Sequence, residues 1–515
     1  MNIKRFGRAA AALLLPALAA PLAAAIVVRG GNVFDPPGMD PARVWDETSS
    51  FYVVNIFDTL VRLDPRTLTI QPSLATAWET SPDGRTWTFR LRRGVRFHDG
   101  TPLDADAVVF SFWRQMDPAN PRRLDDFPLF PEIFSHLQAV RKLDDQRVQF
   151  VLSAPYFPFL ASLTADCASI VSPAAVRRHG AEFTRHPVGT GPFMLESWLP
   201  GKRLVLAANR GYWRSRPPVD QFVETIEPRT ELLSKFFQEG TLDILSSYSI
   251  SQMASFRKLD WVRVTSEPLF SVTYVVLNSA RPRLRSRAVR QALCHAWDPR
   301  ALTLVFQDHV LPTHSLLPPG LAGPAAAAAT APELGFSLAK AKALLRRDGV
   351  PADAPLEMVL LRDEGLIFQV LSMYAKNLKQ AGVLLKLTRL APEEYARRVA
   401  AGDYDLAISS WIADYPDPDS MLFPLLSDKL QQQGFATVAN AGNRRELLER
   451  LHNARRQGDL ARRQAAYAAI DRAVIQDGLI LPLFQSKRVI LSHSRLGAIP
   501  ANPMGRLLLF DLKAP

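Results

Sequence analysis

The sequence predicts an α/β protein of two or three lobes, and two observations lead to this fold class. The chain has 515 residues, which is too many for one simple core, and its 47% hydrophobic and 22% charged residues are values of a globular protein. Between residues 356 and 409, strand-like apolar runs alternate with amphipathic helical runs. That alternation is typical of a mainly parallel sheet wrapped in helices.

The first 25 residues are expected to form a secretory signal peptide. Lys4, Arg5 and Arg8 give a positive start, an apolar run of mostly Ala and Leu follows, and Ala23–Ala25 supplies small residues for cleavage. The apolar run is too short to favour a membrane anchor. We therefore expect the mature protein to be exported and soluble.

The amino-terminal half predicts short strands joined by glycine turns. Residues 26–29 are β-like and end at Gly30 and Gly31, and residues 86–91 and 94–98 are expected to be antiparallel strands. Asp104 is placed to cap a helix over residues 105–115. The Gly-Thr-Gly run that begins at Gly189 is interpreted as a structural turn, because Pro192 follows where a phosphate loop needs a helix amide.

The carboxyl-terminal half predicts longer α/β units. The alternating unit has strands at 356–361, 383–390 and 405–409 with helices at 365–380 and 392–401. Further strands are expected where short apolar runs are rich in β-branched residues, and helices where an apolar stripe recurs every three or four residues. These are strands at 147–152, 188–195, 274–278, 479–484 and 489–491, and helices at 156–163, 230–238, 286–296, 338–347, 444–457 and 460–475.

The basic composition does not by itself identify a partner. The net charge is +12, which could suit nucleic acid, an anionic membrane or an acidic ligand. The Arg and Lys residues are dispersed, mostly on helices with an apolar face, and zinc-finger and RNP-like motifs are absent from the sequence. We expect no nucleic-acid partner, whereas a peripheral protein that binds anionic surfaces stays open as an alternative.

The sequence carries no recognisable catalytic motif. It has no His-Glu-x-x-His, no Cys/His ligand spacing and no Gly-x-Ser-x-Gly. We expect no catalytic residue, no cofactor and no metal; the alternatives are a secreted hydrolase and a calcium site on Asp414, Asp417 and Asp419. Cys167 and Cys294 are expected to be buried, small apolar residues rather than a disulfide.

The segment from Ile408 to Phe423 is the strongest candidate for a site. It runs from a β-like stretch into a proline-broken turn with three aspartates, Trp411 and Tyr415. A carboxylate beside large rings can offer a site to a cation, whereas Asp and Pro also form ordinary solvated turns. The segment leaves the carboxyl end of an α/β strand, where ligands bind in open sheets.

These segments together resemble a known family. The chain is similar to the large periplasmic solute-binding proteins of peptide and nickel ABC importers, the dipeptide/oligopeptide-binding family. The matching pieces occur in family order over nearly the whole mature chain, and the most specific is Ser81-Pro-Asp-Gly-Arg-Thr-Trp-Thr-Phe-Arg-Leu-Arg-Arg-Gly-Val-Arg-Phe-His-Asp-Gly100, with others at 70–78, 106–111, 188–193, 209–213, 287–292, 340–345 and 411–418.

The resemblance implies a fold and a division of the chain. It implies a two-lobed periplasmic binding protein fold of the Venus-flytrap type, with a smaller subdomain inserted in the first lobe. The expected boundaries are a signal peptide at 1–25, lobe I at 26–60 with 185–275 and 480–515, the inserted subdomain at 61–184, and lobe II at 276–479.

The resemblance also implies site residues. In peptide-binding members, an Asp in the position of Asp414 binds the ligand's α-ammonium, so Asp414 is the expected ammonium site and Trp411 its apolar wall. Backbone from Ser410 to Ile412 is expected to extend the hydrogen bonding of a peptide by strand addition. Arg362 matches the residue that meets the peptide carboxylate in the dipeptide branch, and Gly38 lies in a segment similar to that branch's glycine loop.

The implied function is transport without catalysis. The expected ligand is a di- or oligopeptide, and the expected partners are an inner-membrane permease and its ATPase subunits, with the binding protein itself a periplasmic monomer. A metal chelate, haem or opine remains an alternative ligand, because the segment Asn440-Ala-Gly-Asn-Arg-Arg445 departs from the family pattern. Asp417 and Asp419 are assigned turn and capping roles.

Overall fold

The computed structural model describes residues 25–513 except for 45, 65, 117–132, 322, 324–333, 349–353, 363–364 and 501. The expected signal peptide lies outside the described residues apart from Ala25. None of the helices in these described ranges combines the length and the apolar character that crossing a bilayer requires.

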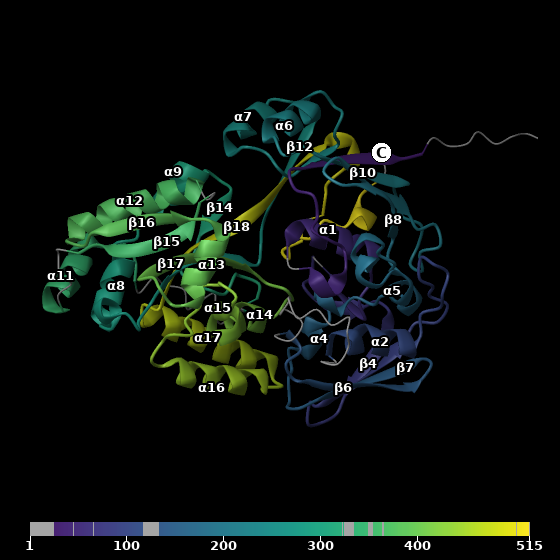
Figure 1. The fold of residues 1–515 in the computed structure, drawn as a ribbon, viewed down its shortest axis with the longest axis horizontal. Helices are drawn as coiled ribbons and strands as arrows, with labels where there is room; N and C mark the ends of the chain where they lie inside the picture. The colour runs from purple at the N-terminus through teal and green to yellow at the C-terminus, as the bar shows by residue number, and fades with distance from the viewer. Residues whose placement is uncertain are drawn as a thin grey trace, which may run out of the picture.

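The first lobe is built on one half of a twelve-stranded sheet, in the order β18-β11-β1-β10-β9-β8 (Figure 1). Gly30 and Gly31 do not end the first strand as expected but lie inside it, where a side chain on Gly30 would collide with the Phe222 ring. The elements of this lobe are β1 (Val27–Asn32), α1 (Glu47–Ile56), α5 (Pro173–His179), β8 (Phe193–Leu199), β9 (Arg203–Ala208), β10 (Gln221–Ile226), α6 (Thr230–Gln238), β11 (Ile244–Leu245), α7 (Met253–Phe256) and β12 (Val262–Pro268).

The second lobe contains the predicted α/β unit. Its strands β15 and β16 run parallel, and β15 is also parallel to β17, which confirms the parallel pairing expected from the alternating pattern. The elements are β13 (Ser271–Leu277), α8 (Arg287–His295), α9 (Arg300–Phe306), β14 (Val310–Pro312), α11 (Leu338–Asp348), β15 (Leu356–Leu361), α12 (Gly365–Ala381), β16 (Leu385–Leu390), α13 (Pro392–Ala400), β17 (Leu406–Ile412), α14 (Asp419–Leu426), α15 (Asp428–Gln432), α16 (Arg444–Arg455) and α17 (Leu460–Gln476).

The central strand β13 is buried along its whole length, because helices cover both faces of its sheet. Successive side chains point to opposite faces, so Val275 and Leu277 join a core with α8, α9 and α12. Tyr274 and Val276 join a second core with α13, α14, α16 and α17 on the other face. The apolar run that predicted this strand therefore supplies two cores at once.

The last strand, β18 (Ile480–His493), connects the two lobes. The two separate strands expected at 479–484 and 489–491 are one continuous strand. Its first residues pair with β13, and its last residues pair with β11 and β12. The chain also passes between the lobes at Leu269 and Phe270, which lie between β12 and β13, and the amide of Leu269 donates to the Ser486 carbonyl at 2.9 Å. The two crossings therefore lie side by side, as a hinge requires.

A separate four-stranded antiparallel sheet, in the order β4-β5-β7-β6, forms what we call the insert, together with its helices α2 and α4. Asp104 caps α2 as expected, since its carboxylate accepts from the amide of Ala107 at 3.0 Å. The prediction of a strand at 94–98 is wrong, because only an isolated bridge from Arg96 to Pro102 forms there. The insert contains β4 (Ala75–Thr80), β5 (Thr86–Leu91), α2 (Ala105–Met116), β6 (Leu137–Asp144), β7 (Arg147–Leu152) and α4 (Phe159–Ser162), and it follows the small pair β2 (Val61–Leu63) and β3 (Ile70–Pro72).

The turn at Gly189 is confirmed as structural. A β-carbon on Gly189 would lie 2.2 Å from the Ile56 carbonyl oxygen, and one on Gly191 would lie 2.5 Å from the Ile56 carbonyl carbon. The amide of Gly191 donates to the same Ile56 carbonyl at 2.9 Å. Glycine is required at both positions because the two backbone segments pack closely. The run is therefore a packing turn and not an anion-binding loop.

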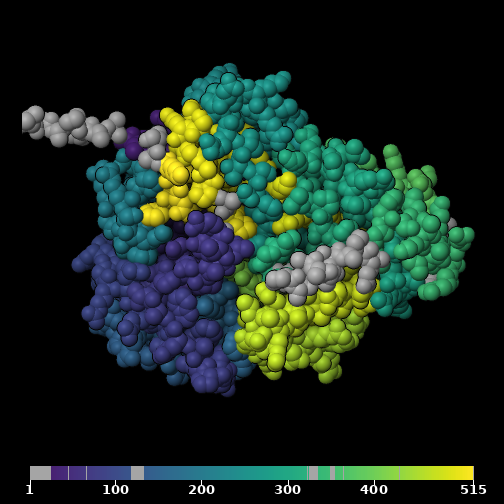
Figure 2. Space-filling model, turned by 180° about the vertical axis from the view of Figure 1, so that it is seen from behind, coloured from purple at the N-terminus to yellow at the C-terminus, as the bar shows by residue number. Residues whose placement is uncertain are grey.

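The insert also contacts the second lobe. Figure 1 places α4 beside α14, and the surface seen from behind in Figure 2 shows the purple and blue insert against the yellow-green helices of residues 444–476. The lobes therefore meet at the hinge and, away from it, at this second contact.

Candidate functional site

The predicted site segment begins at the end of β17 and is held at the hinge. The amide of Ala413 donates to the Phe270 carbonyl at 2.8 Å, on the segment that crosses between the lobes. The next residue, Asp414, donates its amide to the Ser420 hydroxyl at 2.7 Å. Pro416 and Pro418 keep the loop out of helix until α14 begins at Asp419. The loop is therefore fixed at both ends.

A cavity of about 650 Å³ opens beside this loop, between the lobes. Such a volume suits a small ligand. Four of the predicted residues, Ser410, Trp411, Ile412 and Asp414, line it. The other lining residues are Val44, Asp46, Glu47, Ser50, Ile133, Ala165, Asp166, Cys167, Ala413, Leu430, Gln433, Phe435, Met504, Gly505 and Arg506.

The carboxylate of Asp414 lines this cavity without an ion pair to a side chain of the described ranges. Among the described residues, no side chain forms a hydrogen bond or ion pair with it. Burial raises the pKa of Asp414 to about 7, and the nearby negative charge of Asp166 adds to the rise, while the positive charge of Arg506 and a backbone hydrogen bond oppose it. A half-buried carboxylate that no side chain pairs with directly gains from a cation that enters the cavity.

Asp166 and Arg506 are site residues that sequence reasoning missed. Arg506 forms an ion pair with Asp166 at 2.8 Å, and Ser50 donates to the same carboxylate at 2.5 Å. Arg506 also donates to the backbone carbonyl of Asp414 at 3.4 Å. No local motif marks these residues, because they meet Asp414 from distant parts of the chain, and only the fold brings them together.

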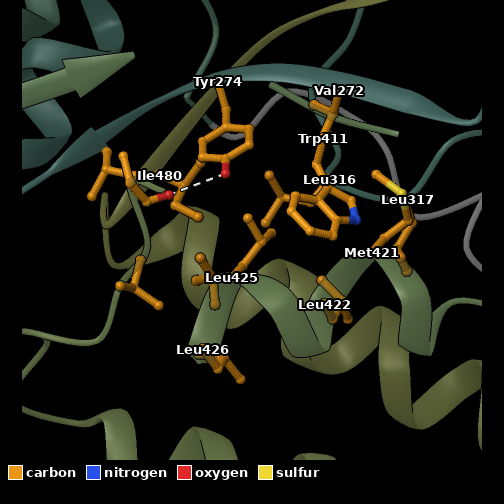
Figure 3. Packing of buried hydrophobic residues seen from close by; sticks show 14 of the residues in the cluster. Val272, Tyr274, Leu316, Leu317, Trp411, Met421, Leu422, Leu425, Leu426 and Ile480 are labelled. Carbon is orange, nitrogen blue, oxygen red and sulfur yellow. Dashed lines mark hydrogen bonds between the residues drawn. The ribbon is translucent and has the colours of Figure 1, made fainter. Parts of the chain in front are cut away.

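Trp411 is partly a core residue and partly a wall of the cavity. Its side chain is only 8% exposed and its ring packs edge-on to Phe435, with centroids 5.7 Å apart. The indole N–H donates to the Ser420 carbonyl at 2.9 Å. Figure 3 shows the indole over Met421 and Leu422 of α14. The ring orientation is therefore set by the packing of the second lobe.

The backbone of β17 offers a free edge at the cavity. Residues 406–412 pair with β13 along one side, but on the other side only Leu406 and Ala407 pair with β15. Within the described ranges, no strand pairs with Ser410 or Ile412 on that second side. Their backbone groups are therefore available for strand addition. The Ile412 side chain is 39% exposed, and the Ser410 hydroxyl lies 2.8 Å from that of Thr273.

The structure does not bring Arg362 or Gly38 to this cavity. Arg362 is exposed at the end of β15, where its carbonyl accepts from the Arg389 guanidinium. Gly38 packs on Thr184, and a β-carbon there would lie 2.0 Å from the threonine hydroxyl. Its lack of a side chain is explained by this close contact.

Asp417 and Asp419 are not residues of a solvated turn. Asp417 does accept from the amide of Asp419 at 3.0 Å, as a capping residue does. Both carboxylates are nevertheless buried and ion-paired, Asp417 with Arg463 at 3.0 Å and Asp419 with Arg455 at 2.7 Å. The three aspartates of the segment thus divide into two paired carboxylates and one unpaired carboxylate, Asp414.

Metal-ligating residues do not gather in the described part of the chain, where no group of three or more His, Cys, Asp or Glu side chains could hold an ion. Cys167 and Cys294 are both buried and unpaired, as expected. Burial raises the pKa of the Cys167 thiol well above its usual value, and the negative charge of Asp414 raises it further. The thiol is therefore protonated and unreactive at neutral pH.

Known proteins resemble this chain over most of its length. The di/tripeptide-binding protein 2 of Pseudomonas aeruginosa (strain UCBPP-PA14) is 28% identical over 509 residues, which cover 92% of this chain and 93% of the relative. The heme-binding protein A of Haemophilus influenzae (strain ATCC 51907 / DSM 11121 / KW20 / Rd) is 30% identical over 416 residues, which cover 76% of this chain and 75% of the relative.

The fold is also similar to solved structures. The dipeptide-binding protein from Pseudoalteromonas sp. SM9913, in complex with Met-Leu, superposes with a TM-score of 0.82 at 25% identity and covers 95% of this chain and 100% of its own. The profile of the family described as "Bacterial extracellular solute-binding proteins, family 5 Middle" matches residues 69–433, well over half of the chain. This two-lobed α/β chain therefore belongs to family 5 of the bacterial extracellular solute-binding proteins, the family that serves ABC importers.

Proposed function

We propose that this chain is the substrate-binding component of an ABC importer and that it captures a di- or oligopeptide between its lobes. The observation that carries the proposal is the unpaired Asp414 carboxylate in the interlobe cavity, next to the free edge of β17. A peptide supplies both matching groups, an ammonium and a backbone that can add to a strand. The peptide-binding relatives support the same ligand class.

The binding mode follows from the chemistry of the lining. The ligand's α-ammonium pairs with Asp414 and its backbone pairs with Ser410 and Ile412, while its side chains contact Trp411 and Phe435. A charge-assisted hydrogen bond of this kind is strengthened where water is excluded. The ligand-binding roles of Arg362 and Gly38 remain predictions from the resemblance, because neither residue lines the cavity.

We propose that the protein delivers its ligand for transport without changing it chemically. After export and removal of a signal peptide, the monomer closes on its ligand in the periplasm and docks on an inner-membrane permease with its ATPase subunits. We propose no catalytic residue and no cofactor for this cycle. Two relatives with transport names, each 28% identical to this chain, support this role.

The division of the chain that we propose starts from the expected segments, which are residues 26–60, 185–275 and 480–515 for lobe I, 61–184 for the inserted subdomain and 276–479 for lobe II. We assign α5 to lobe I, because its Ala175 and Val176 pack in the core of that lobe. The hydrogen bonds between the crossing segments favour moving the boundaries at 275 and 480 to about residues 270 and 485, where the strands change lobes.

A second candidate ligand is a non-peptide solute such as haem, a metal chelate or an opine. The similarity to heme-binding protein A, at 30% identity, favours haem among these. A haem ligand would rely on the apolar part of the lining rather than on Asp414. The two candidates therefore differ in whether a ligand ammonium is required.

The test is calorimetry with the dipeptide Met-Leu and with N-acetyl-Met-Leu. We expect the free dipeptide to bind and the acetylated form to bind at least about 10-fold more weakly, because acetylation removes the charge that pairs with Asp414. Equal affinities would contradict the ammonium role. Native mass spectrometry of protein purified without refolding would identify a haem or other co-purified solute, which would favour the second candidate.

A further inference from the structure

The second contact between the lobes is a buried polar cluster around Asp419, at the start of α14. On one carboxylate oxygen, Tyr156 donates at 2.9 Å and Tyr415 at 3.0 Å. On the other, Tyr467 donates at 3.0 Å. Arg455 donates to both oxygens, at 2.7 and 2.9 Å. Asp419 has no exposed surface, so its charge depends on these donors.

One of these donors comes from the insert and the others from the second lobe. Tyr156 lies just before α4, whereas Tyr415, Arg455 and Tyr467 belong to the loop before α14 and to α16 and α17. A backbone hydrogen bond also joins the insert to the second lobe, because the amide of Phe157 donates to the Arg455 carbonyl at 3.0 Å. Tyr415 in turn packs into the hydrophobic core of the insert. Opening of the lobes about the hinge would separate these partners.

The cluster and the ligand site share one loop. Asp419 is followed by Ser420, whose hydroxyl accepts from the amide of Asp414 and whose carbonyl accepts from the indole of Trp411. Burial alone would raise the pKa of Asp419, but the Arg455 charge and the tyrosine hydrogen bonds outweigh it and lower the pKa. An ionised Asp419 at the first turn of α14 also suits the helix dipole. The position of this carboxylate therefore determines where the loop presents Asp414.

We propose that Tyr156 is a positioning residue that couples closure of the lobes to the geometry of the Asp414 site. When the insert docks, the tyrosine hydroxyl completes the set of donors around Asp419, and the same contact holds the loop that carries Asp414. The link to ligand affinity rests on the proposed function, whereas the link to closure does not. The closed arrangement is thus stabilised by a contact far from the hinge.

The test compares two tyrosine-to-phenylalanine variants. Tyr156→Phe removes the hydroxyl that crosses between the lobes and keeps the ring. The matched control is Tyr274→Phe, because Tyr274 is equally buried and donates to the Ala436 carbonyl at 3.1 Å within the second lobe (Figure 3). Small-angle X-ray scattering would give the radius of gyration of each protein, alone and with a saturating concentration of Met-Leu.

We expect Tyr156→Phe to shift the open–closed equilibrium about 10-fold or more toward open, since its hydroxyl binds a charged group, and to weaken Met-Leu binding by a similar factor. The control should change neither. An equal radius of gyration for the two variants, with and without Met-Leu, would overturn the inference. If Met-Leu fails to bind even the wild type, the proposed ligand is wrong, and the scattering of the ligand-free proteins alone decides the role of Tyr156.

Discussion

The raised pKa of Asp414 predicts that peptide affinity depends on pH in a definite direction. In the unliganded protein, burial and the charge of Asp166 raise the pKa of Asp414 to about 7. A bound ammonium stabilises the ionised carboxylate, so binding below that pKa requires the release of a proton. Affinity should therefore fall as the pH falls through 7, and it should fall again above pH 8 as the ligand's amine loses its charge.

The size of the effect follows from the ionised fraction of Asp414. With a pKa of about 7, roughly three quarters of the carboxylate is ionised at pH 7.5 and about 3% at pH 5.5. Affinity for Met-Leu should then be about 25-fold weaker at pH 5.5 than at pH 7.5 if the bound carboxylate stays ionised throughout. Asp414→Asn removes the charge and should bind Met-Leu about 10- to 100-fold more weakly than the wild type at pH 7.5.

The assay is calorimetry from pH 5.5 to 8.5 in buffers of different ionisation enthalpy, which also counts the protons released. The Asn variant should show no loss of affinity between pH 7.5 and 5.5, and Glu449→Gln, on the exposed face of α16, should behave as the wild type. A wild-type affinity that stays constant from pH 5.5 to 7.5 would contradict the pairing of the ligand's ammonium with Asp414.

The same pKa has a consequence for folding. Because the folded pKa of Asp414 lies above that of the unfolded chain, which is about 3.9, the folded state binds the proton more tightly between those values. This residue's contribution to stability therefore improves as the pH falls through 7 and is least favourable above it. Asp414→Asn should raise the melting temperature of the ligand-free protein at pH 8, whereas a lower melting temperature would contradict the unpaired state of the carboxylate.

Two further predictions concern stability. Arg455→Met should lower the free energy of unfolding, measured by chemical denaturation, by about 3 to 5 kcal/mol, because Asp419 would be left charged and buried. Adding Asp419→Asn to this variant should recover part of the loss. If the effects of the two substitutions simply add, the ion pair would be contradicted. Gly189→Ala should destabilise the protein by more than about 1 kcal/mol, because the new β-carbon would collide with the Ile56 carbonyl. Gly442→Ala is the control and should have little effect, because nothing lies within 4 Å of a β-carbon there. Similar melting temperatures for the two variants would show that the backbone contact is easily relieved.

Local patterns predicted the regular elements well. The spacing of apolar residues placed β15 and α6 with their observed bounds, because each reflects a period within a few neighbouring residues. The same reasoning failed where a contact from elsewhere decided the outcome. Gly30 and Gly31 continue β1 because they pack against neighbouring side chains. The break expected between the strands at 479–484 and 489–491 is absent because β18 pairs with strands of both lobes.

The candidate site, like the fold, was predictable from the sequence only in part. Sequence alone indicated that Asp414, Trp411 and the end of β17 belong together, because they are close in the chain and follow an α/β strand. It could not show that Asp417 and Asp419 are neutralised by arginines from α16 and α17, since an ion pair depends on distances that no local pattern contains.

Residue patterns were enough to predict the α/β class, most of the elements and the segment that carries the candidate site, because hydrophobic periodicity, capping and turn residues act over a few positions. Which carboxylate of that segment is unpaired became clear from the folded chain. The tertiary structure brought Asp166 and Arg506 to the cavity, placed Arg362 outside it and joined Tyr156 to Asp419 across the lobes. Burial and electrostatic pairing depend on which distant segments meet, and folding alone settles that.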